Sequence, residues 1–566
     1  MKYVKEFVFS TLAILMASCS FDNETPEQLP ASKSFTASIE SGNVTRTALN
    51  SNTANDPYPV WSSDDQIKVI NTATNDVRYF NLSSEAGQRA ATFDGTIKVE
   101  DSGNEYYAVY SGDINAENTE NGPVIAQSGS NVTISGTIPS VQPSTPGFHS
   151  NLHFMTAYTT GTAFKFKNAM SLLKIYISNN TYDNFGICKI VFKSNKADDK
   201  IAGDFTANIS GTDGTLSGYS VTNGSPEITI GDGTTPLSTG YYYIAILPCD
   251  FENGFTLTYL DERDNNKKQY DRIKTTSFPV AASEIINLGS YTAKDVAKEA
   301  YVDLEVGSTS TKWCIENVYD DETDKTSTRD ASYYSWGETL VKANQEKYSD
   351  TYRQYAWYFN YGVAQGSDDD DAYLYRCYDL GLGAANWLMF TTNESYDFIH
   401  TYVLTSMKGV LIKYNSSNNY IQSSADWRGG VNDGKTELEF VDDAAYQKSA
   451  QQILRIPSEA DFNALKNAIT NGTLELTKVS STYKIKNKTT GYFITLPAAG
   501  YRFKSSSSGN DNPQSTSTAA YWTRDRSSAA ADSYKARSFN IASTSSITIT
   551  DEERAGGRLL RAVVVR

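Results

Sequence analysis

Arg46 is the residue whose type and setting most directly suggest chemistry, because it is the first arginine of the 566-residue chain and lies in a polar segment, NVTRTAL (43–49). Proteases of trypsin-type specificity cut after arginine, and an exposed run of small polar residues lets such an enzyme engage the backbone. The bond between Arg46 and Thr47 is therefore a candidate cleavage site. The alternative is that Arg46 is an ordinary solvated charge in a loop.

The segment before Cys19 has the layout of an export signal. A basic start is followed by a mostly apolar run at 7–16 and by small residues next to the cysteine. This run is shorter than the roughly 20 apolar residues that a membrane span needs. The sequence MASC (16–19) resembles the lipobox of bacterial lipoproteins, which implies a signal peptide at 1–18 and a lipid on Cys19. The alternative is an ordinary signal peptide with an incidental cysteine.

Familiar catalytic motifs are absent from the sequence. His149 and His153 in HSNLH lack the glutamate of a metalloprotease HExxH, and GLGAAN (381–386) lacks the third glycine of a dinucleotide loop. Neither GxSxG nor GxxxxGK(S/T) occurs. A scattered carboxylate pair of glycosidase type stays open. We therefore predict a protein that is not an enzyme and uses no cofactor.

The sequence offers little to hold a metal ion. The acidic run at 368–371 lacks the alternating spacing and the glycine of an EF-hand, so a solvated charge run is favoured over a calcium site. Apart from Cys19 there are four cysteines without a CxxC pair, which argues against a zinc or thioredoxin-type site. Disulfides and buried free thiols both stay open for these four. They are Cys188, Cys249, Cys314 and Cys377.

Composition and charge bound the class of protein. The net charge of -16 repels nucleic acid and anionic membranes, so neither is expected as a partner. Short hydrophobic segments of alternating polarity are separated by turn residues, as in VIAQSGSNVTISGTI (124–138). This pattern is typical of antiparallel β-structure. We therefore predict a mainly β protein.

Length and shifts in composition predict several domains. Six of the seven tryptophans follow residue 300, which indicates a boundary near 287–304. A turn-rich segment that gives way to new alternating strands indicates another boundary near 158. The predicted organisation is a linker at 19–32, β-domains at 33–158 and 159–293, and a carboxyl-terminal domain at 300–566.

The amino-terminal region resembles a known family. An early strand at 35–39, the Thr-Arg-Thr segment, Trp61 and then Asp65 before a further strand occur in the order found at the start of Bacteroidetes fimbrillins, the subunits of type V pili. The segment FKFKNAMSLLKIYI (164–177) similarly resembles the entry to the second domain of a fimbrillin. The resemblance covers residues 30–293.

This resemblance implies two β-sandwich domains and a role for Arg46. In the family, an arginine-specific surface protease cuts after such an arginine and releases the leader and first strand, and a strand donated by another pilus subunit fills the vacated groove. The physical basis is β-strand addition. Phe35, Ala37 and Ile39 alternate with polar residues, as expected of a removable edge strand with one buried face.

The last third resembles a second family. WCIENV (313–318), LRIPSEADFNALKN (454–467) and YFITLPAAGYR (492–502) occur in the order of the Fibrobacter succinogenes major paralogous domain. This implies an α+β fold of the C-type-lectin-like kind at 300–566.

One helix is predicted from the residues themselves. Ser458 and Asp461 have the spacing of a capping box, and Phe462 and Leu465 lie on one face of the helix that would follow.

Lectin-like folds commonly bind ligands with loops near their last strands, which here lie at 505–539. Small polar residues in this segment favour an adaptable recognition surface, while plain solvated loops are the equal alternative. The ligand would be a glycan or protein of a host or bacterial surface. The candidate contact residues are Trp522, Arg524, Asp525, Arg526, Tyr534 and Arg537.

These observations predict an accessory or tip, adhesin-like subunit of a type V pilus. Asp22 and Glu24 resemble the acidic signal that sends Bacteroidetes lipoproteins to the cell surface. The precursor would then be surface-exposed and anchored by lipid to the outer membrane, and the processed protein would lie in the fimbrium. The final strand, at 559–565, is expected to be used inside its own domain, which favours a tip over a stalk position.

Two alternatives stay open. The first is a permanently anchored outer-membrane lipoprotein that binds a glycan or protein, does not polymerise, and is never cut at Arg46. The second is an enzyme on the lectin-like scaffold, which would need a specific carboxylate pair.

Overall fold

The structure is a computed structural model, and its description covers the chain in segments. The described residues are 29–39, 48–49, 59–111, 123–149, 152, 154–307, 310–319, 332–334, 336–337, 388–390, 409–411, 435–501, 515–528, 535–553 and 557–565. The features predicted at Cys19, Arg46, Thr47, Tyr534, Cys377 and the acidic run 368–371 lie outside these residues.

The described residues are mostly β-strand, which confirms the predicted mainly β fold. Contacts divide the chain into two compact units. The first comprises Met1–Gly136, His153–Ala169 and Thr206–Tyr219, and the second comprises Thr137–Leu152, Met170–Phe205 and Ser220–Arg566. The domain boundaries near 158 and 293 stay predictions. No helix in the described segments is both long and apolar enough to cross a membrane.

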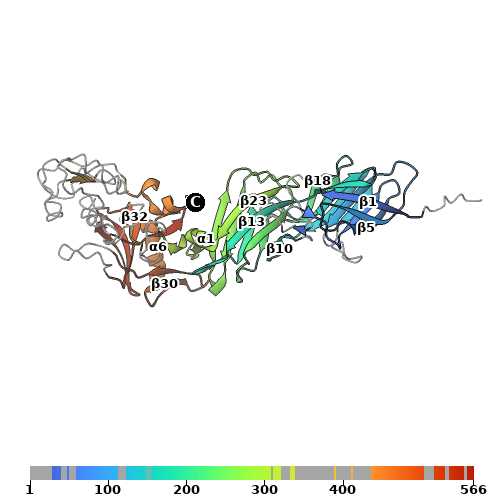
Figure 1. Ribbon diagram of the computed structural model, residues 1–566. Helices are drawn as coiled ribbons and strands as arrows, with labels where there is room; N and C mark the ends of the chain where they lie inside the picture. Colours follow the sequence, from blue (N-terminus) through green and yellow to red (C-terminus); the bar gives the residue numbers. More distant parts are fainter. Residues whose placement is uncertain are drawn as a thin grey trace, which may run out of the picture. The chain divides into compact units, whose positions relative to one another are not determined.

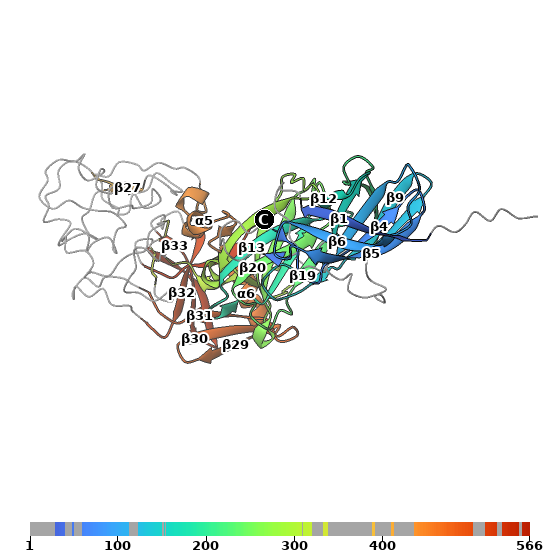
Figure 2. The same cartoon turned by 45° about the vertical axis from the view of Figure 1, so that its right-hand side comes forward.

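A closed barrel of seven strands forms the core of the first unit, and β1 is one of these strands (Figures 1 and 2). The order around the barrel is β1, β12, β11, β7, β4, β5 and β6. Their bounds are β1 Ala31–Ile39, β4 Gln66–Asn71, β5 Asp76–Ser84, β6 Ala90–Ile97, β7 Tyr106–Ser111, β11 Phe154–Thr159 and β12 Ala163–Asn168. Alternate side chains of these strands point inward, so the interior fills with apolar and aromatic groups.

Two smaller sheets are formed by strands that lie before, between or after the barrel strands in the sequence. A four-stranded sheet has the order β18, β17, β9 and β8. Its strands are β8 Val124–Ser128, β9 Asn131–Ile138, β17 Ala202–Ile209 and β18 Leu216–Ser225. The short strands β2 Ala48–Leu49 and β3 Pro59–Val60 pair with each other.

The second unit contains a nine-stranded sheet of order β10, β19, β16, β21, β22, β24, β25, β35 and β28. The bounds are β10 Val141–Gln142, β16 Lys189–Ser194, β19 Glu227–Ile230, β21 Phe255–Asp261, β22 Lys268–Lys274, β24 Tyr301–Asp303, β25 Lys312–Asn317, β28 Leu454–Arg455 and β35 Arg561–Val564. A three-stranded sheet joins β20 Gly240–Ile246, β13 Ser171–Asn179 and β23 Ile285–Thr292, and a small pair joins β14 Thr181–Tyr182 and β15 Phe185–Gly186.

The nine-stranded sheet runs without a break across residue 300. The pair Gln269 and Tyr301 joins β22 to β24, and the Tyr301 hydroxyl donates to Asp271 Oδ2 at 2.7 Å. Helix α1, Ala293–Glu299, begins at the cap Thr292, whose side chain accepts the Asp295 N–H. Backbone pairing and a buried side-chain hydrogen bond therefore join the strands on the two sides of the predicted boundary.

The carboxyl-terminal segments contain the predicted helix. Helix α6, Glu459–Thr470, begins with a capping box between Ser458 and Asp461, and Phe462 is buried against Phe539 with ring centroids 4.3 Å apart. That prediction is confirmed.

The other elements are η2 Arg263–Asn265, η7 Phe440–Asp442, α5 Ala444–Lys448, the sheet of β29 Leu474–Val479, β30 Thr482–Asn487 and β31 Phe493–Pro497, the sheet of β32 Ala519–Arg526, β33 Lys535–Ser543 and β34 Ser546–Glu553, and the pair β26 Leu388–Phe390 and β27 Gly409–Leu411.

Three cysteines of the described segments are free thiols. Cys188 and Cys314 are buried, and Cys249 is partly buried. Burial raises the pKa of Cys188 to about 12 and that of Cys249 to about 11. Such thiols are poor nucleophiles at neutral pH.

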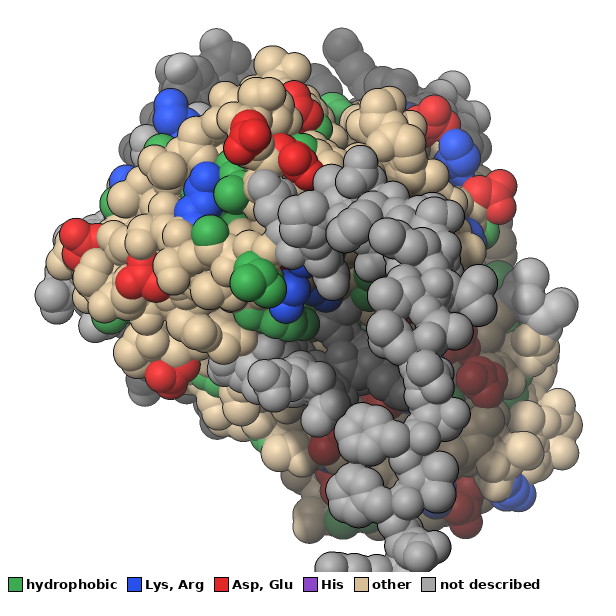
Figure 3. Space-filling model, turned by 90° about the vertical axis from the view of Figure 1, so that its right-hand side faces the viewer, with side chains coloured by type: hydrophobic (Ala, Val, Ile, Leu, Met, Phe, Trp, Pro, Cys, Tyr) green, Lys and Arg blue, Asp and Glu red, His purple; other side chains and the backbone are tan. Residues whose placement is uncertain are grey.

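On the face that Figure 3 shows, acidic and basic side chains are scattered among uncharged polar ones. Over the described residues of this face, no continuous basic stripe of the kind that binds nucleic acid is formed.

Candidate functional site

Strand β1 is paired on both of its edges. Its residues Ala31–Ser38 pair antiparallel with β6, from Ala31 opposite Ile97 to Ser38 opposite Ala90. Thr36–Ile39 also pair in parallel with β12, opposite residues 163–166. The expectation of an edge strand is therefore wrong, because the barrel closes through β1 instead of ending at it. Taking β1 away would open the barrel and expose two strand edges.

The inward face of β1 is apolar, as its alternation predicts. Phe35 and Ala37 are 0% exposed and Ile39 is 3% exposed, while Thr36 between them is exposed. Because successive side chains of a strand point to opposite faces, a shift of one residue in the pairing would point the polar side chains of β1 into the core. The register of β1 is therefore strongly specified. That the strand is removable stays a prediction.

Phe35 fills an aromatic cage. Its ring centroid lies 5.1 Å from those of Phe80 and Tyr106 and 4.8 Å from that of Phe164. Gly95 of β6 makes room for this cage, because a Cβ there would lie 2.8 Å from the Phe80 ring. The contacts with Phe80 and Tyr106 are edge-to-face, and such contacts add stability beyond the burial of area. The cage would accept a large apolar side chain if β1 left.

Trp61 lies beside the centre of β1. It is fully buried, and its ring centroid lies 5.0 Å from that of Phe93, 5.4 Å from that of Tyr110 and 5.5 Å from that of Phe166. Its indole Nε1–H donates to the backbone carbonyl oxygen of Ala37 at 3.1 Å. Trp61 therefore holds β1 through the main chain. The sequence pattern marked Trp61 only as part of a family resemblance and gave no sign of this contact.

A turn after Trp61 holds the indole in place. Asp65 accepts the Ser62 N–H at 2.6 Å and the Tyr110 hydroxyl at 2.8 Å, through its two different carboxylate oxygens. Burial, and then the neighbouring Asp65 carboxylate, raise the pKa of Tyr110 well above its usual range. Tyr110 therefore stays a neutral donor at every physiological pH. The Trp61 and Asp65 spacing seen in the sequence has this structural reason.

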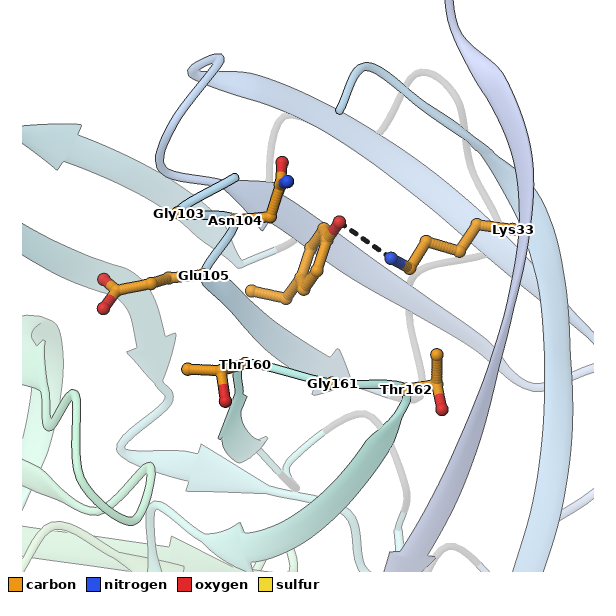
Figure 4. Close-up of a pocket in the computed structure, with 8 residues that line it drawn as sticks. Lys33, Gly103, Asn104, Glu105, Thr160, Gly161 and Thr162 are labelled. Atoms are coloured by element: carbon orange, nitrogen blue, oxygen red, sulfur yellow. Dashed lines mark hydrogen bonds between the residues drawn. The ribbon is translucent and has the colours of Figure 1, made fainter. Parts of the chain in front are cut away.

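The first half of β1 is held on one side only, because its pairing with β12 begins at Thr36. Beside it lies a pocket of about 460 Å³, lined by Lys33, by 103–106 and by 160–162. Figure 4 shows Lys33 among the residues that line this pocket, and its Nζ donates to the Tyr106 hydroxyl at 2.8 Å. This end of β1 is accordingly the less constrained one.

The predicted cleavage bond lies between two strands in sequence. Strand β1 ends at Ile39 and β2 begins at Ala48, so Arg46 and Thr47 fall in the connection between them. These two residues and Cys19 lie outside the described residues, and the roles assigned to them stay predictions.

Two of the predicted ligand residues are part of the carboxyl-terminal core. Trp522 is 0% exposed, and its indole N–H donates to the Tyr334 carbonyl oxygen at 2.8 Å. Arg526 is 9% exposed and donates to the carbonyl oxygens of Lys435 and Ser527 at 2.8 and 2.7 Å. Their polar atoms are thus engaged with the protein backbone.

Three other predicted ligand residues, Arg524, Asp525 and Arg537, lie near the start of α6. The Asp525 carboxylate accepts the Glu459 N–H at 2.6 Å, and burial raises its pKa. Arg537 binds the Glu459 carboxylate through Nη2 at 2.7 Å and Nε at 2.9 Å, and Arg524 binds Glu437 at 2.7 Å. A pocket of about 310 Å³ beside Arg524 also has Lys312 in its wall. A ligand site on these loops stays a prediction.

No protein-family model matches the chain, and no curated protein matches it. Among solved structures, a "putative cell adhesion protein" from Bacteroides ovatus matches with a TM-score of 0.29 and 14% identity, over 46% of this chain and 93% of that one. The tip fimbrial protein Mfa3 from Porphyromonas gingivalis, truncated at its carboxyl terminus, matches with a TM-score of 0.21 and 10% identity, over 43% and 81%. A "putative cell adhesion protein" from Bacteroides eggerthii has values of 0.18 and 10%, over 45% and 79%.

Proposed function

We propose that the chain is an accessory or tip subunit of a type V pilus. It would be exported as a surface lipoprotein anchored to the outer membrane through Cys19 and activated by an arginine-specific surface protease that cuts after Arg46. The observation that carries this proposal is the position of β1, a nine-residue strand that closes the barrel on both edges and precedes Arg46.

Removal of β1 would leave a groove fit for another strand. Strand β6 would lose eight paired residues and β12 four, which leaves backbone N–H and C=O groups without partners. The aromatic cage around Phe35 would open to water at the same time. Both costs are relieved by an incoming extended segment, because it restores the ladder hydrogen bonds and refills the apolar sites. The donor would be another pilus subunit.

A tip or accessory position is favoured over a stalk position by the state of β35. This strand lies between β25 and β28, with Val563 paired to Trp313 on one side and to Arg455 on the other. Donating it to a neighbour would take apart the sheet that it belongs to. An adhesin-like role would then fall to the carboxyl-terminal loops, with a glycan or protein of a host or bacterial surface as the ligand.

A second function is favoured by one observation. With β1 in place the barrel is already complete, so it has no structural need of a donated strand. The alternative is therefore a permanently anchored outer-membrane lipoprotein that binds a glycan or protein and does not polymerise.

The proposal is tested by limited digestion of the full mature chain, without its lipid, by an arginine-specific protease. We expect an early cut that gives a product beginning at Thr47, and none in an Arg46→Gln variant. The cut chain should then bind a strand peptide from a pilus subunit, whereas the uncut chain should not. Cleavage at other arginines while Arg46 stays intact would support the anchored lipoprotein instead.

A further inference from the structure

We propose that Trp61 sets the register and the size limit for the strand that replaces β1. The donor would present a large aromatic, a small and a branched aliphatic residue at alternate positions, and it would come from a different protein. This inference rests on the proposed function and adds to it the side-chain pattern of the partner.

Trp61 stays in the barrel when β1 leaves, because its anchors belong to other elements. Its backbone N–H donates to the Gln88 carbonyl oxygen at 2.8 Å, and its own carbonyl accepts the Gly87 N–H at 2.7 Å. Its ring packs against side chains of β6, β7 and β12. The indole is therefore a fixed part of the groove wall.

The indole limits the size of the residue at the centre of the groove. Its nitrogen lies 3.1 Å from the Ala37 carbonyl oxygen, and Ala37 is 0% exposed, so the ring edge stands directly against that residue. Protein interiors are packed without spare volume, and extra methylene groups in such a place force neighbouring side chains out of position. A residue as small as alanine is required there.

The same indole also fixes the register. It binds a main-chain carbonyl, which every strand can offer, so the contact does not depend on the sequence of the donor. A strand displaced by one residue would put its outward side chains into the groove. A strand displaced by two would put its large residue against the indole. One placement therefore satisfies both the aromatic cage and Trp61.

The side-chain pattern of β1 occurs again in strands that are already paired on both edges. The segment FTASI (35–39) of β1 recurs as FTANI (205–209) in β17, with the same three positions buried. Strand β17 lies between β18 and β9. A looser match is Leu560, just before β35, with Ala562 and Val564 inside β35, and β35 lies between β25 and β28. Both strands are held on two edges, so within the described segments neither copy of the pattern is free for donation by a second copy of this chain, which favours a donor from a different protein.

The test uses the full mature chain with a site for a sequence-specific protease in place of residues 41–46. After cleavage, β1 is held only by non-covalent contacts, and an excess of a fluorescent peptide can replace it. Four peptides are compared by the label retained after gel filtration. They are residues 31–40 as they stand, the same peptide with Ala37→Leu, the same peptide with Thr36→Leu, and residues 201–210 with the FTANI segment.

We expect the native peptide, the Thr36→Leu control and the FTANI peptide to be retained. The label retained from the Ala37→Leu peptide should be lower than that from the native peptide by a factor of about ten or more. In a chain with Trp61→Phe, the difference in retention between the native peptide and the Ala37→Leu peptide should be smaller. Equal retention of the Ala37→Leu and native peptides overturns the size limit while the proposed function stands. Retention of no peptide overturns the proposed function and this inference together. Self-association of the cleaved chain contradicts a donor from a different protein.

Discussion

Thr36 donates its backbone N–H to the carbonyl oxygen of Thr162 at 2.9 Å, and this bond begins the parallel pairing that closes the barrel. The two residues are 126 positions apart in sequence. The integrity of the first unit therefore depends on a strand that precedes a candidate cleavage site. If the proposed cut after Arg46 releases β1, the same groove would hold β1 before processing and a donated strand afterwards.

Truncation of Phe35 should weaken the barrel strongly. Phe35→Ala removes a ring from the aromatic cage, and we expect it to lower the free energy of unfolding of the first unit by about 3–5 kcal/mol. Hydrogen exchange of peptides from β6 and β12 measures this locally. Ser32→Ala, on the exposed part of the same strand, is the control and should stay within about 0.5 kcal/mol of the native protein. Equal exchange in both variants would contradict the importance of the cage.

A methyl group on β6 should disturb the same cage from the other side. A Cβ at Gly95 would lie 2.8 Å from the Phe80 ring and from the Tyr79 carbonyl oxygen, so Gly95→Ala should cost about 1–3 kcal/mol of unfolding free energy. At Gly161 the nearest atom to an added Cβ is 3.8 Å away, which makes Gly161→Ala the matched control. Chemical denaturation of the two variants compares them. Equal unfolding free energies for the two variants would contradict tight packing around Gly95.

The Gln451 side chain should stabilise strand β22 of the nine-stranded sheet. Its side-chain amide donates to the Asp271 carbonyl oxygen at 2.8 Å, and its oxygen accepts the Ile273 N–H at 3.3 Å, so it covers the edge of β22 like a short strand. Gln451→Ala leaves these groups unpaired and should cost about 1–3 kcal/mol, with faster exchange of the Ile273 amide. Gln447→Ala, an exposed glutamine, is the control. Unchanged exchange at Ile273 would argue against this role.

Asp232 predicts a pH dependence in the second unit. Hydrogen bonds from the backbone N–H groups of Thr235 and Thr234 lower its pKa from 3.8 to about 2. Because the pKa is lower in the folded state, the stabilisation is fully present above the usual value of 3.8 and is lost as the pH falls toward 2. Asp232→Asn should therefore flatten the loss of stability in this window, measured by denaturation at a series of pH values. An unchanged profile would contradict the assignment.

Local features were predictable from the sequence, and long-range closure was not. The alternation of Phe35, Ala37 and Ile39 reports which face is buried, and the Ser458 and Asp461 pair reports where a helix begins. Neither kind of signal says that β1 meets β12, because strand pairing across 126 residues is fixed by the shape of the whole barrel. Strand pairing of Gln269 with Tyr301 across a shift in composition was hidden for the same reason.

The candidate site was predictable in part. Trp61 could be noticed as a lone tryptophan, but its bond to a backbone carbonyl leaves no trace in the residue types. Arg526 and Trp522 looked like recognition residues because they lie in the polar segment near the last strands, where lectin-like folds commonly bind ligands. Their partners are main-chain carbonyls, which every sequence offers. The alternation in FTASI and its repeat as FTANI were the signals in the sequence that pointed to the pattern of the groove.

The most direct measurement of the central claim is the amino-terminal sequence of the protein taken from the surface of its native cells. If β1 is a removable strand, the sequence begins at Thr47 and the peptide that holds Phe35 is absent from the purified protein. If all of the protein begins at a lipid-modified Cys19 and retains β1, the barrel is never opened, and the chain is a permanently anchored lipoprotein.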